Sequence, residues 1–251
     1  MTIRAVIFDL GHTLWDFAPT EASRRYAVMR LYNRLYEARG DGTPAPRALD
    51  RAFTSAVARW LAAWNAENDD LVQLPTDQLV REMLSTFELE ADADLLRELT
   101  VAALGLELQM PVIDPYSLAA IATMHAGGLS MGCVTNTLLL EEGILDILTR
   151  LGVGRYLDAR VVSSAAGYRK PHASLFQRAL DELGVGPHEA VFVGDRLYDD
   201  VSGAKAIGMR AVLTHQYRQE PLEGAIVAPD AVIRHLAELP DAIARLDVLD
   251  P

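Results

Sequence analysis

Hydrophobic positions follow two different periods along the chain, and the change between them separates a helical block from a region of alternating strands and helices. Residues 4–9 form a short apolar segment that ends in an acid, which is typical of a buried strand. Apolar side chains then recur at helical spacing, most clearly between Leu49 and Trp64. Short segments rich in glycine and proline separate the helices of this block.

From about residue 114 onwards, short β-branched segments alternate with amphipathic ones. Strands that alternate with helices form right-handed βαβ units, so this region predicts a parallel sheet with helices on both faces. We therefore expect a doubly wound α/β core of residues 1–16 and 112–251, with a helical cap of residues 17–111 inserted after the first strand. The expected strands are 129–135, 160–163, 190–193 and 210–213, and the expected helices are about 114–126, 141–151, 172–183 and 199–206.

Composition and charge exclude several other classes of protein. The chain has 251 residues, of which 50% are hydrophobic and 23% are charged, which is the composition of an ordinary globular protein. Its net charge of −12 argues against nucleic acid or an anionic membrane as a partner. The single cysteine excludes an intramolecular disulfide and a multi-cysteine metal site. No apolar run is long enough for a membrane span or a secretory signal peptide, so we expect a cytoplasmic protein.

Polar side chains follow the predicted strands at the points where these end. Asp9 comes after the first strand, Thr135 and Asn136 come after the second, and Asp195 comes after a later one. Lys170 lies in the loop that follows another strand. Because the carboxyl ends of the strands form the ligand-binding edge of an open α/β sheet, we expect these five side chains to converge on one site.

The residue types at this edge favour phosphoryl transfer with a magnesium ion. Asp195, Asp199 and Asp200 lie in one turn-rich segment, and oxygen ligands without histidine or thiol favour magnesium. Lys170 is suited to neutralising a transferring anion as a point charge. Asp9 is then a candidate nucleophile that forms a covalent aspartyl phosphate.

Four segments of the sequence resemble the motifs of the haloacid dehalogenase (HAD) superfamily, in the branch that carries an α-helical cap after the first motif. Their order and spacing match across the whole predicted core, which makes the resemblance far more specific than any single motif. The four segments are residues 6–14 around Asp9, 133–136 around Thr135, 167–171 around Lys170 and 191–201 around Asp195.

The resemblance implies a role for each matching residue. Asp9 would be the nucleophile and a magnesium ligand, and the carbonyl of Gly11 and the carboxylate of Asp195 would be further ligands. Asp200 would support the metal directly or through water. Lys170 would hold the phosphate and orient Asp9.

The remaining matches are expected on the phosphate and substrate side of the same site. Thr135 offers a hydroxyl group to the phosphate, and the turn that it shares with Asn136 offers backbone N–H donors. Thr13 and His12 are expected to contact substrate as well. The ligand implied is a small phosphorylated metabolite, and both a monomer and a homodimer are compatible with the sequence.

One position departs from the family pattern. Phosphatases of this family usually carry a second aspartate two residues after the nucleophile, as general acid and base, but here that position is Gly11 and the usual following glycine is His12. Three interpretations follow. The protein is a phosphatase that relies on water, another side chain or a good leaving group; His12 takes over the proton transfer; or the protein is a weak catalyst or a binder.

The interpretation that we favour is a magnesium-dependent hydrolase of small phosphate monoesters, similar to phosphoglycolate phosphatases of the family. A 2-haloacid dehalogenase is the alternative enzyme, although Gly11 does not match the aromatic residue usual there and the acidic cluster argues for a metal. The phosphonatases of the family use a cap lysine, and residues 17–111 contain no lysine. A HAD-fold binder with little catalytic activity is the alternative outside enzymes.

Overall fold

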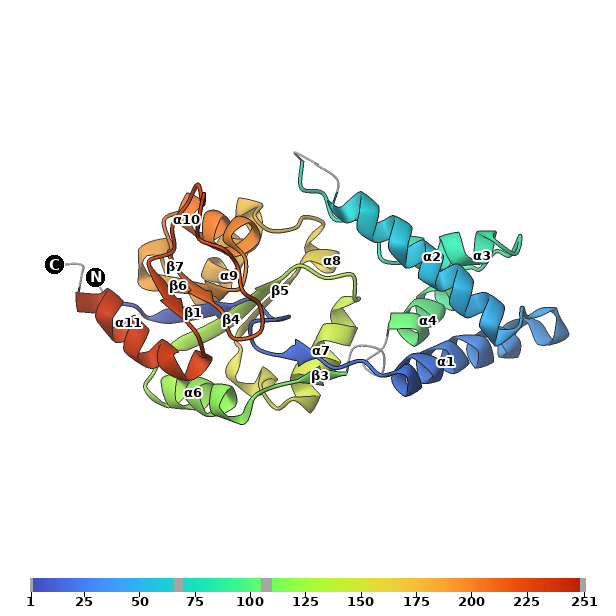
Figure 1. Cartoon of the computed structure of the whole chain (residues 1–251), viewed down its shortest axis with the longest axis horizontal. Coiled ribbons are helices and arrows are strands. Elements are labelled where there is room, and N and C mark those ends of the chain that lie inside the picture. The colour runs from blue at the N-terminus through green and yellow to red at the C-terminus, as the bar shows by residue number, and fades with distance from the viewer. Residues whose placement is uncertain (1, 66–69, 105–109, 249–251) are drawn as a thin grey trace.

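The computed structural model describes residues 2–65, 70–104 and 110–248, and its centre is a six-stranded sheet (Figure 1). All neighbouring strands in this sheet are parallel, in the order β5-β4-β1-β6-β7-β8. The predicted doubly wound α/β core is therefore confirmed. The strands are β1 (Ala5–Phe8), β4 (Ser130–Thr135), β5 (Ala159–Val162), β6 (Ala190–Gly194), β7 (Arg210–Thr214) and β8 (Ala231–Ile233).

Side chains of the central strand alternate between two hydrophobic clusters, one on each face of the sheet. Val6 and Phe8 belong to one cluster, and Ala5 and Ile7 belong to the other; all four are fully buried. This period of two is why a strand covered on both faces has a continuous apolar sequence. Asp9 is the first residue beyond the apolar run, so the end of the strand delivers it to the edge of the sheet.

Helices cover both faces of the sheet, as βαβ connections require. The first cluster includes residues of α6 (Pro115–Ala126), α7 (Glu141–Arg150) and α11 (Leu239–Val248). The second includes residues of α9 (Ala173–Leu183) and α10 (Gly203–Ala206). A short helix, α8 (Ser163–Ala166), directly follows β5.

A block of helices lies to one side of the sheet (Figure 1). The chain leaves the sheet through β2 (Asp16–Phe17) and returns through β3 (Pro111–Val112), and these two strands pair antiparallel. Thr20 caps the first helix, because its hydroxyl group accepts a hydrogen bond of 3.0 Å from the backbone N–H of Ser23. The helices are α1 (Glu21–Arg39), α2 (Pro46–Asn65), α3 (Gln78–Ser85) and α4 (Ala93–Leu104).

One predicted helix has a different form from the one expected. In place of a regular helix over 199–206, the chain makes a π-helical turn, η4 (Leu197–Ser202), which leads into α10. The turn begins earlier because the Asp200 carboxylate accepts hydrogen bonds from the backbone N–H groups of Asp195 and Arg196, which draws the strand end and the turn together. No helix in the described part of the chain is long and apolar enough to cross a membrane.

Candidate functional site

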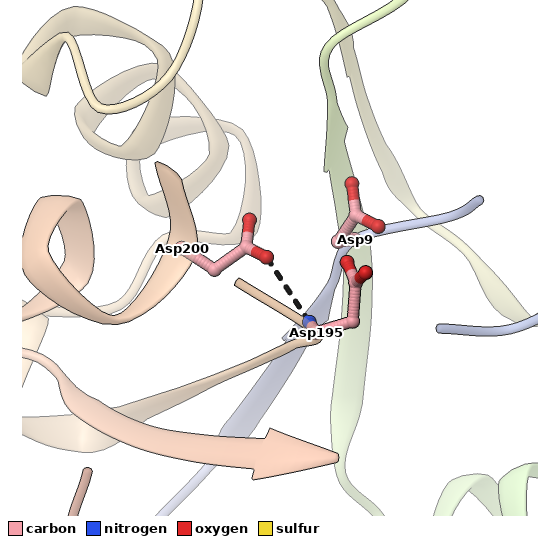
Figure 2. Close-up of side chains that lie close together, drawn as sticks. All are labelled: Asp9, Asp195 and Asp200. Atoms are coloured by element: carbon pink, nitrogen blue, oxygen red, sulfur yellow. Dashed lines mark hydrogen bonds between the residues drawn. The ribbon is translucent and has the colours of Figure 1, made fainter. Parts of the chain in front are cut away.

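Three buried aspartates meet at the carboxyl edge of the sheet (Figure 2). Asp9 follows β1, Asp195 follows the neighbouring strand β6, and Asp200 reaches the same place from η4. One carboxylate oxygen from each residue lies within 4.8 Å of the other two. Asp9 is 7% exposed, Asp195 is 2% exposed and Asp200 is 1% exposed, so little water screens their mutual repulsion.

This repulsion is visible in the acid–base properties of the cluster. Burial, together with the charges of Asp9 and Asp200, raises the pKa of Asp195 from an ordinary 3.8 to about 8. Burial and the charge of Asp9 likewise raise the pKa of Asp200, although the nearby lysine opposes this shift. A cation that took the place of the proton on Asp195 would relieve this repulsion, so the cluster is suited to bind one.

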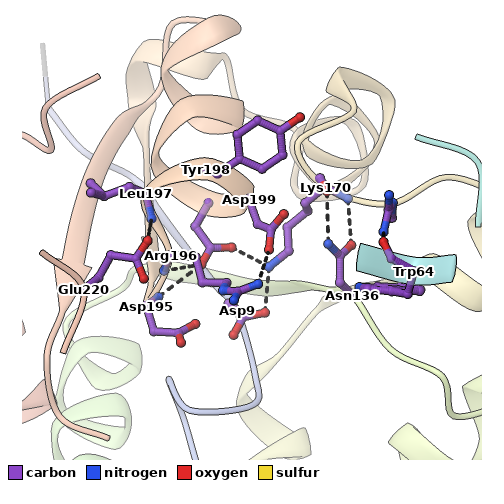
Figure 3. Close-up of polar contacts among 12 residues, drawn as sticks. Asp9, Trp64, Asn136, Lys170, Asp195, Arg196, Leu197, Tyr198, Asp199 and Glu220 are labelled. Carbon is purple, nitrogen blue, oxygen red and sulfur yellow. Dashed lines mark hydrogen bonds and ion pairs between the residues drawn. The ribbon is translucent and has the colours of Figure 1, made fainter. Parts of the chain in front are cut away.

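Lys170 supplies one positive charge to this cluster. Its Nζ atom lies 2.6 Å from Oδ1 of Asp9 and 2.6 Å from Oδ1 of Asp200, and its side chain is 2% exposed. Burial by itself would lower the pKa of Lys170, but the carboxylates of Asp200 and Asp9 hold it above its usual range. The lysine is therefore charged and fixed between two of the three aspartates (Figure 3).

The position of Asp200 depends on a glycine and on backbone donors. Its Oδ2 atom accepts hydrogen bonds from the backbone N–H of Asp195 at 3.1 Å and of Arg196 at 3.0 Å. A Cβ atom on Gly194 would lie 2.3 Å from both Cγ and Oδ2 of Asp200. Only glycine at the end of β6 leaves room for this carboxylate.

The cluster fits a divalent cation. Oδ2 of Asp195 is buried and has no hydrogen-bond partner among the described residues, although Nη1 of Arg218 lies 2.8 Å away. A buried acceptor without a hydrogen bond is costly, and a coordinated cation would relieve that cost. Carboxylate oxygens without histidine or thiol are the donors that hard cations prefer.

Thr135 and Asn136 continue β4 into the same site. Asn136 is bound to the loop that carries the lysine: its Nδ2 donates to the carbonyl of Lys170 at 3.1 Å, and its Oδ1 accepts from the backbone N–H of Lys170 at 2.6 Å. Its amide therefore positions Lys170, a role that the sequence does not predict. Thr135 is 3% exposed at the end of its strand.

A cavity of about 290 Å³ opens over these residues. Of the residues predicted for the site, only Thr13 is not among those that line it. Thr13 is fully buried, and its hydroxyl group has no hydrogen-bond partner in the described part of the chain. The predicted residues that line the cavity are Asp9, Gly11, His12, Thr135, Asn136, Lys170, Asp195 and Asp200.

The turn after Asp9 has an unusual backbone conformation at His12. His12 has a φ of 60°, a left-handed conformation that favours glycine, and its Nδ1 lies 2.9 Å from Oδ1 of Asp16. A Cβ atom on Gly11 would lie 3.0 Å from two ring atoms of Phe17. The ring of Phe17 therefore takes part of the space that an aspartate side chain at position 11 would need.

Two arginines of the site were missed from the sequence. Arg218 pairs with Asp195, and Arg196 pairs with Asp199 at 3.2 Å. Arg218 lies in the loop after β7, so the rule that ligands bind beyond the carboxyl ends of strands would have pointed to that loop. Arg196 lies directly after Asp195, but a single arginine beside an acid carries no distinct signal in the sequence.

The chain is similar to known hydrolases over most of its length. The family model for haloacid dehalogenase-like hydrolases matches residues 3–208. A protein named glyceraldehyde 3-phosphate phosphatase, from Methanopyrus kandleri, is 32% identical over 97% of this chain and 98% of its own length. A phosphoglycolate phosphatase from Yersinia pseudotuberculosis is 29% identical, covering 99% and 96% of the two chains. The solved structure of a 2-haloacid dehalogenase from Pseudomonas syringae pv. Tomato matches with a TM-score of 0.69 and 27% identity, over 98% of this chain and all of the other.

Proposed function

The chain belongs to the haloacid dehalogenase-like hydrolases, and we propose that it is a magnesium-dependent hydrolase of small phosphate monoesters with Asp9 as the nucleophile. The observation that carries the proposal is the meeting of three buried carboxylates with Lys170 at one end of the sheet. The phosphatase names of relatives that match nearly the whole chain support the same activity.

The chemistry has two displacements at phosphorus. An oxygen of Asp9 attacks the phosphorus atom, the bond to the ester oxygen breaks, and the departing alcohol takes up a proton. Water then attacks the phosphorus of the aspartyl phosphate, which releases inorganic phosphate and regenerates the carboxylate. When bound, magnesium would supply positive charge that lets one anion approach another, held by Asp9, Asp195, Asp200 and the carbonyl of Gly11.

Two residues of the chain are placed to hold the phosphate group. Lys170 is charged, buried and already in contact with Asp9, so it fixes the direction of the nucleophile and lowers the repulsion of the incoming anion. Thr135 lies at the end of β4 and lines the same cavity, where its hydroxyl group offers a hydrogen bond to a phosphate oxygen.

We propose that His12 donates the proton that the departing alcohol takes up. It lines the cavity, its Nδ1 is held by Asp16, and no described residue bonds to its Nε2. A non-glycine residue in a left-handed conformation costs free energy, and such strain concentrates at functional positions. This arrangement compensates for Gly11, where the usual aspartate is missing.

A dehalogenase activity is the second candidate, favoured by the likeness to the solved 2-haloacid dehalogenase. It would use Asp9 as nucleophile on carbon, with departure of a halide ion. Halide release needs no proton donor, which would suit Gly11. The three clustered carboxylates argue for the phosphatase. Besides the nucleophile Asp9, the site holds two more buried acids, which would bind a cation but repel a halide ion.

The proposal is tested by phosphate release from a panel of small phosphate esters, with magnesium and with a chelator. We expect release only with magnesium, and we expect Asp9→Asn to abolish it while the fold is retained. A surface variant, Asp94→Asn in the first turn of α4, is the matched control for loss of one carboxylate. Halide release from 2-haloacids without magnesium, and no phosphate release, would replace the proposal with the dehalogenase.

A further inference from the structure

The cavity has a charged side and an apolar side, and these lie on different parts of the chain. Helix α2 contributes Trp60, Leu61 and Trp64 to the cavity, and no charged side chain of this helix lines it. Further apolar side chains come from the core, after β4 and on α7; they are Leu138, Leu139, Ile144 and Ile147. A substrate held with its phosphate on Lys170 would therefore direct its alcohol part toward an apolar wall.

The aromatic part of this wall is held in place. The rings of Trp60 and Trp64 stack with centroids 4.6 Å apart and an interplanar angle of 25°. The guanidinium carbon of Arg169 lies 4.9 Å from the Trp64 ring centroid, and Arg169 also donates a hydrogen bond to the carbonyl of Trp64. Because Arg169 directly precedes Lys170, Trp64 is tied to the loop that carries the phosphate-binding lysine (Figure 3).

The cations of the cavity are already paired with its acids. Lys170 contacts Asp9 and Asp200, and the two arginines contact the other two aspartates of the lining, Asp195 and Asp199. Four carboxylates thus face three cationic side chains among the described residues that line the cavity. A second anion on the substrate, such as a carboxylate beside its phosphate, would have to break one of these contacts to gain a partner, which is costly in a buried site.

We infer that this cavity selects phosphate monoesters whose alcohol part is neutral and aromatic, or similarly bulky and apolar, over monoesters that carry a second anion. The inference rests on the proposed function and specifies its substrate class. The volume of about 290 Å³ leaves room for one ring beside the phosphate, because a cavity of about 150 Å³ is enough for benzene.

Three phosphate esters of primary alcohols test this selection, because their leaving groups have similar basicity. They are benzyl phosphate, ethyl phosphate and 2-phosphoglycolate. We expect kcat/KM for benzyl phosphate to exceed that for 2-phosphoglycolate at least tenfold. Trp64→Ala should lower kcat/KM for benzyl phosphate about tenfold more than it lowers kcat/KM for ethyl phosphate, which is the range for losing an apolar pocket contact. Trp64→Phe should keep most of the preference, which separates loss of the wall from loss of the fold.

Binding without turnover provides a second measurement. With magnesium present, benzylphosphonate should bind at least tenfold more tightly than phosphonoacetate, and Trp64→Ala should remove the difference. Tyr116→Ala is the matched control, because this side chain is 72% exposed and does not line the cavity. The control should change neither binding nor turnover.

Two results would overturn the inference and leave the phosphatase intact. One is a preference for 2-phosphoglycolate that disappears in Arg218→Gln, which would show that Arg218 leaves Asp195 to bind a substrate carboxylate. The other is equal turnover of all three esters, unchanged in Trp64→Ala. Absence of phosphate release from every ester would instead overturn the proposed function, and the phosphonate measurements would still decide whether the aromatic wall binds such ligands.

Discussion

At the scale of single residues, His12 combines a strained backbone with a place in the cavity. Its φ of 60° is one that glycine adopts without strain. We therefore expect His12→Gly to change the free energy of unfolding by less than about 1 kcal/mol, because relief of strain offsets the lost side-chain contacts. Turnover of ethyl phosphate should fall by about 10² or more, the usual contribution of general acid catalysis, and turnover of an activated aryl phosphate should fall less. Chemical denaturation and steady-state kinetics measure the two effects.

Glu88→Gly is the control for this prediction. Glu88 also has a positive φ, of 56°, and it is exposed in the helical block away from the cavity. This variant should relieve similar strain and leave turnover unchanged. Equal losses on the ethyl and aryl esters in His12→Gly would show that His12 positions the site and does not donate the proton.

The raised pKa of Asp195 predicts how stability depends on pH when no metal is bound. Its pKa is raised from 3.8 to about 8, so between these values the folded state holds a proton that the unfolded state has lost. Stability should therefore fall as pH rises through this window. Asp195→Asn removes the charge and should be more stable than the natural protein at pH 9 in a chelator, by at least about 1.4 kcal/mol, the equivalent of one pKa unit.

The measurement is chemical denaturation at pH 5, 7 and 9 with a chelator present. The advantage of Asp195→Asn should grow with pH, and the exposed Asp94→Asn should show no such growth. A difference that stays constant across this range would mean that the carboxylate of Asp195 is ionised in the folded state throughout.

At the scale of elements, the contact between β6 and η4 sets the position of Asp200. A Cβ atom on Gly194 would collide with that carboxylate at 2.3 Å. We expect Gly194→Ala to displace Asp200 from Lys170 and to reduce phosphate release by about 10² or more, since small misplacements of catalytic groups are costly. Magnesium should also bind more weakly, which calorimetry measures independently of turnover.

Gly143→Ala is the control for this substitution. Gly143 lies in α7, and a Cβ atom there would meet only Leu139 Cβ, at an ordinary 3.8 Å. Alanine in a helix should stabilise the fold by roughly 0.5–1 kcal/mol and leave activity unchanged. Full activity in Gly194→Ala would mean that the position of Asp200 in this structure is not needed for turnover.

The sequence predicted the main elements because each carries a strong local signal. The parallel sheet was predicted from the apolar run that ends at Asp9 and from the alternation of strands and helices. Asp9, Asp195 and Lys170 lie close together, as expected for residues at the ends of parallel strands and in the loops after them. The strands β2 and β3 were not predicted, because two residues are too few to show a period. The π-helical form of η4 depends on a side chain bonding to backbone across a turn, which periodicity does not report.

Contacts between segments far apart in the chain could not be predicted from the sequence either. Nothing local indicates that the ring of Phe17 approaches Gly11, or that Arg218 reaches Asp195. The same holds for the contact of residues 71–73 with residues 167–169. There the backbone N–H of Gln73 donates to the carbonyl of Gly167 at 3.0 Å, and that of Arg169 donates to Leu71 at 2.9 Å.

At the scale of the whole molecule, two of the connections between the helical block and the sheet run through the backbone. The strands β2 and β3 carry the chain across, and the backbone bonds of residues 71–73 hold the block against the loop that leads to Lys170. Gln73 strengthens the second connection, because its Nε2 donates to the carbonyl of Thr137 at 3.2 Å. We propose that residues 17–111 are a cap in this sense: a separable unit that supplies the aromatic wall and closes the site.

This proposal predicts what remains when the helical block is removed. Phe17 and Pro111 are paired residues of β2 and β3, so an Asn-Gly turn can join them directly in place of residues 18–110. We expect the shortened chain to unfold cooperatively and to bind magnesium, because the sheet and the aspartates remain. It should hydrolyse ethyl phosphate detectably but prefer benzyl phosphate by less than about twofold, because Trp60 and Trp64 are absent. Full-length Trp64→Ala, measured beside it, separates loss of the wall from loss of closure. A shortened chain with no cooperative transition would show that sheet and helices form one inseparable core.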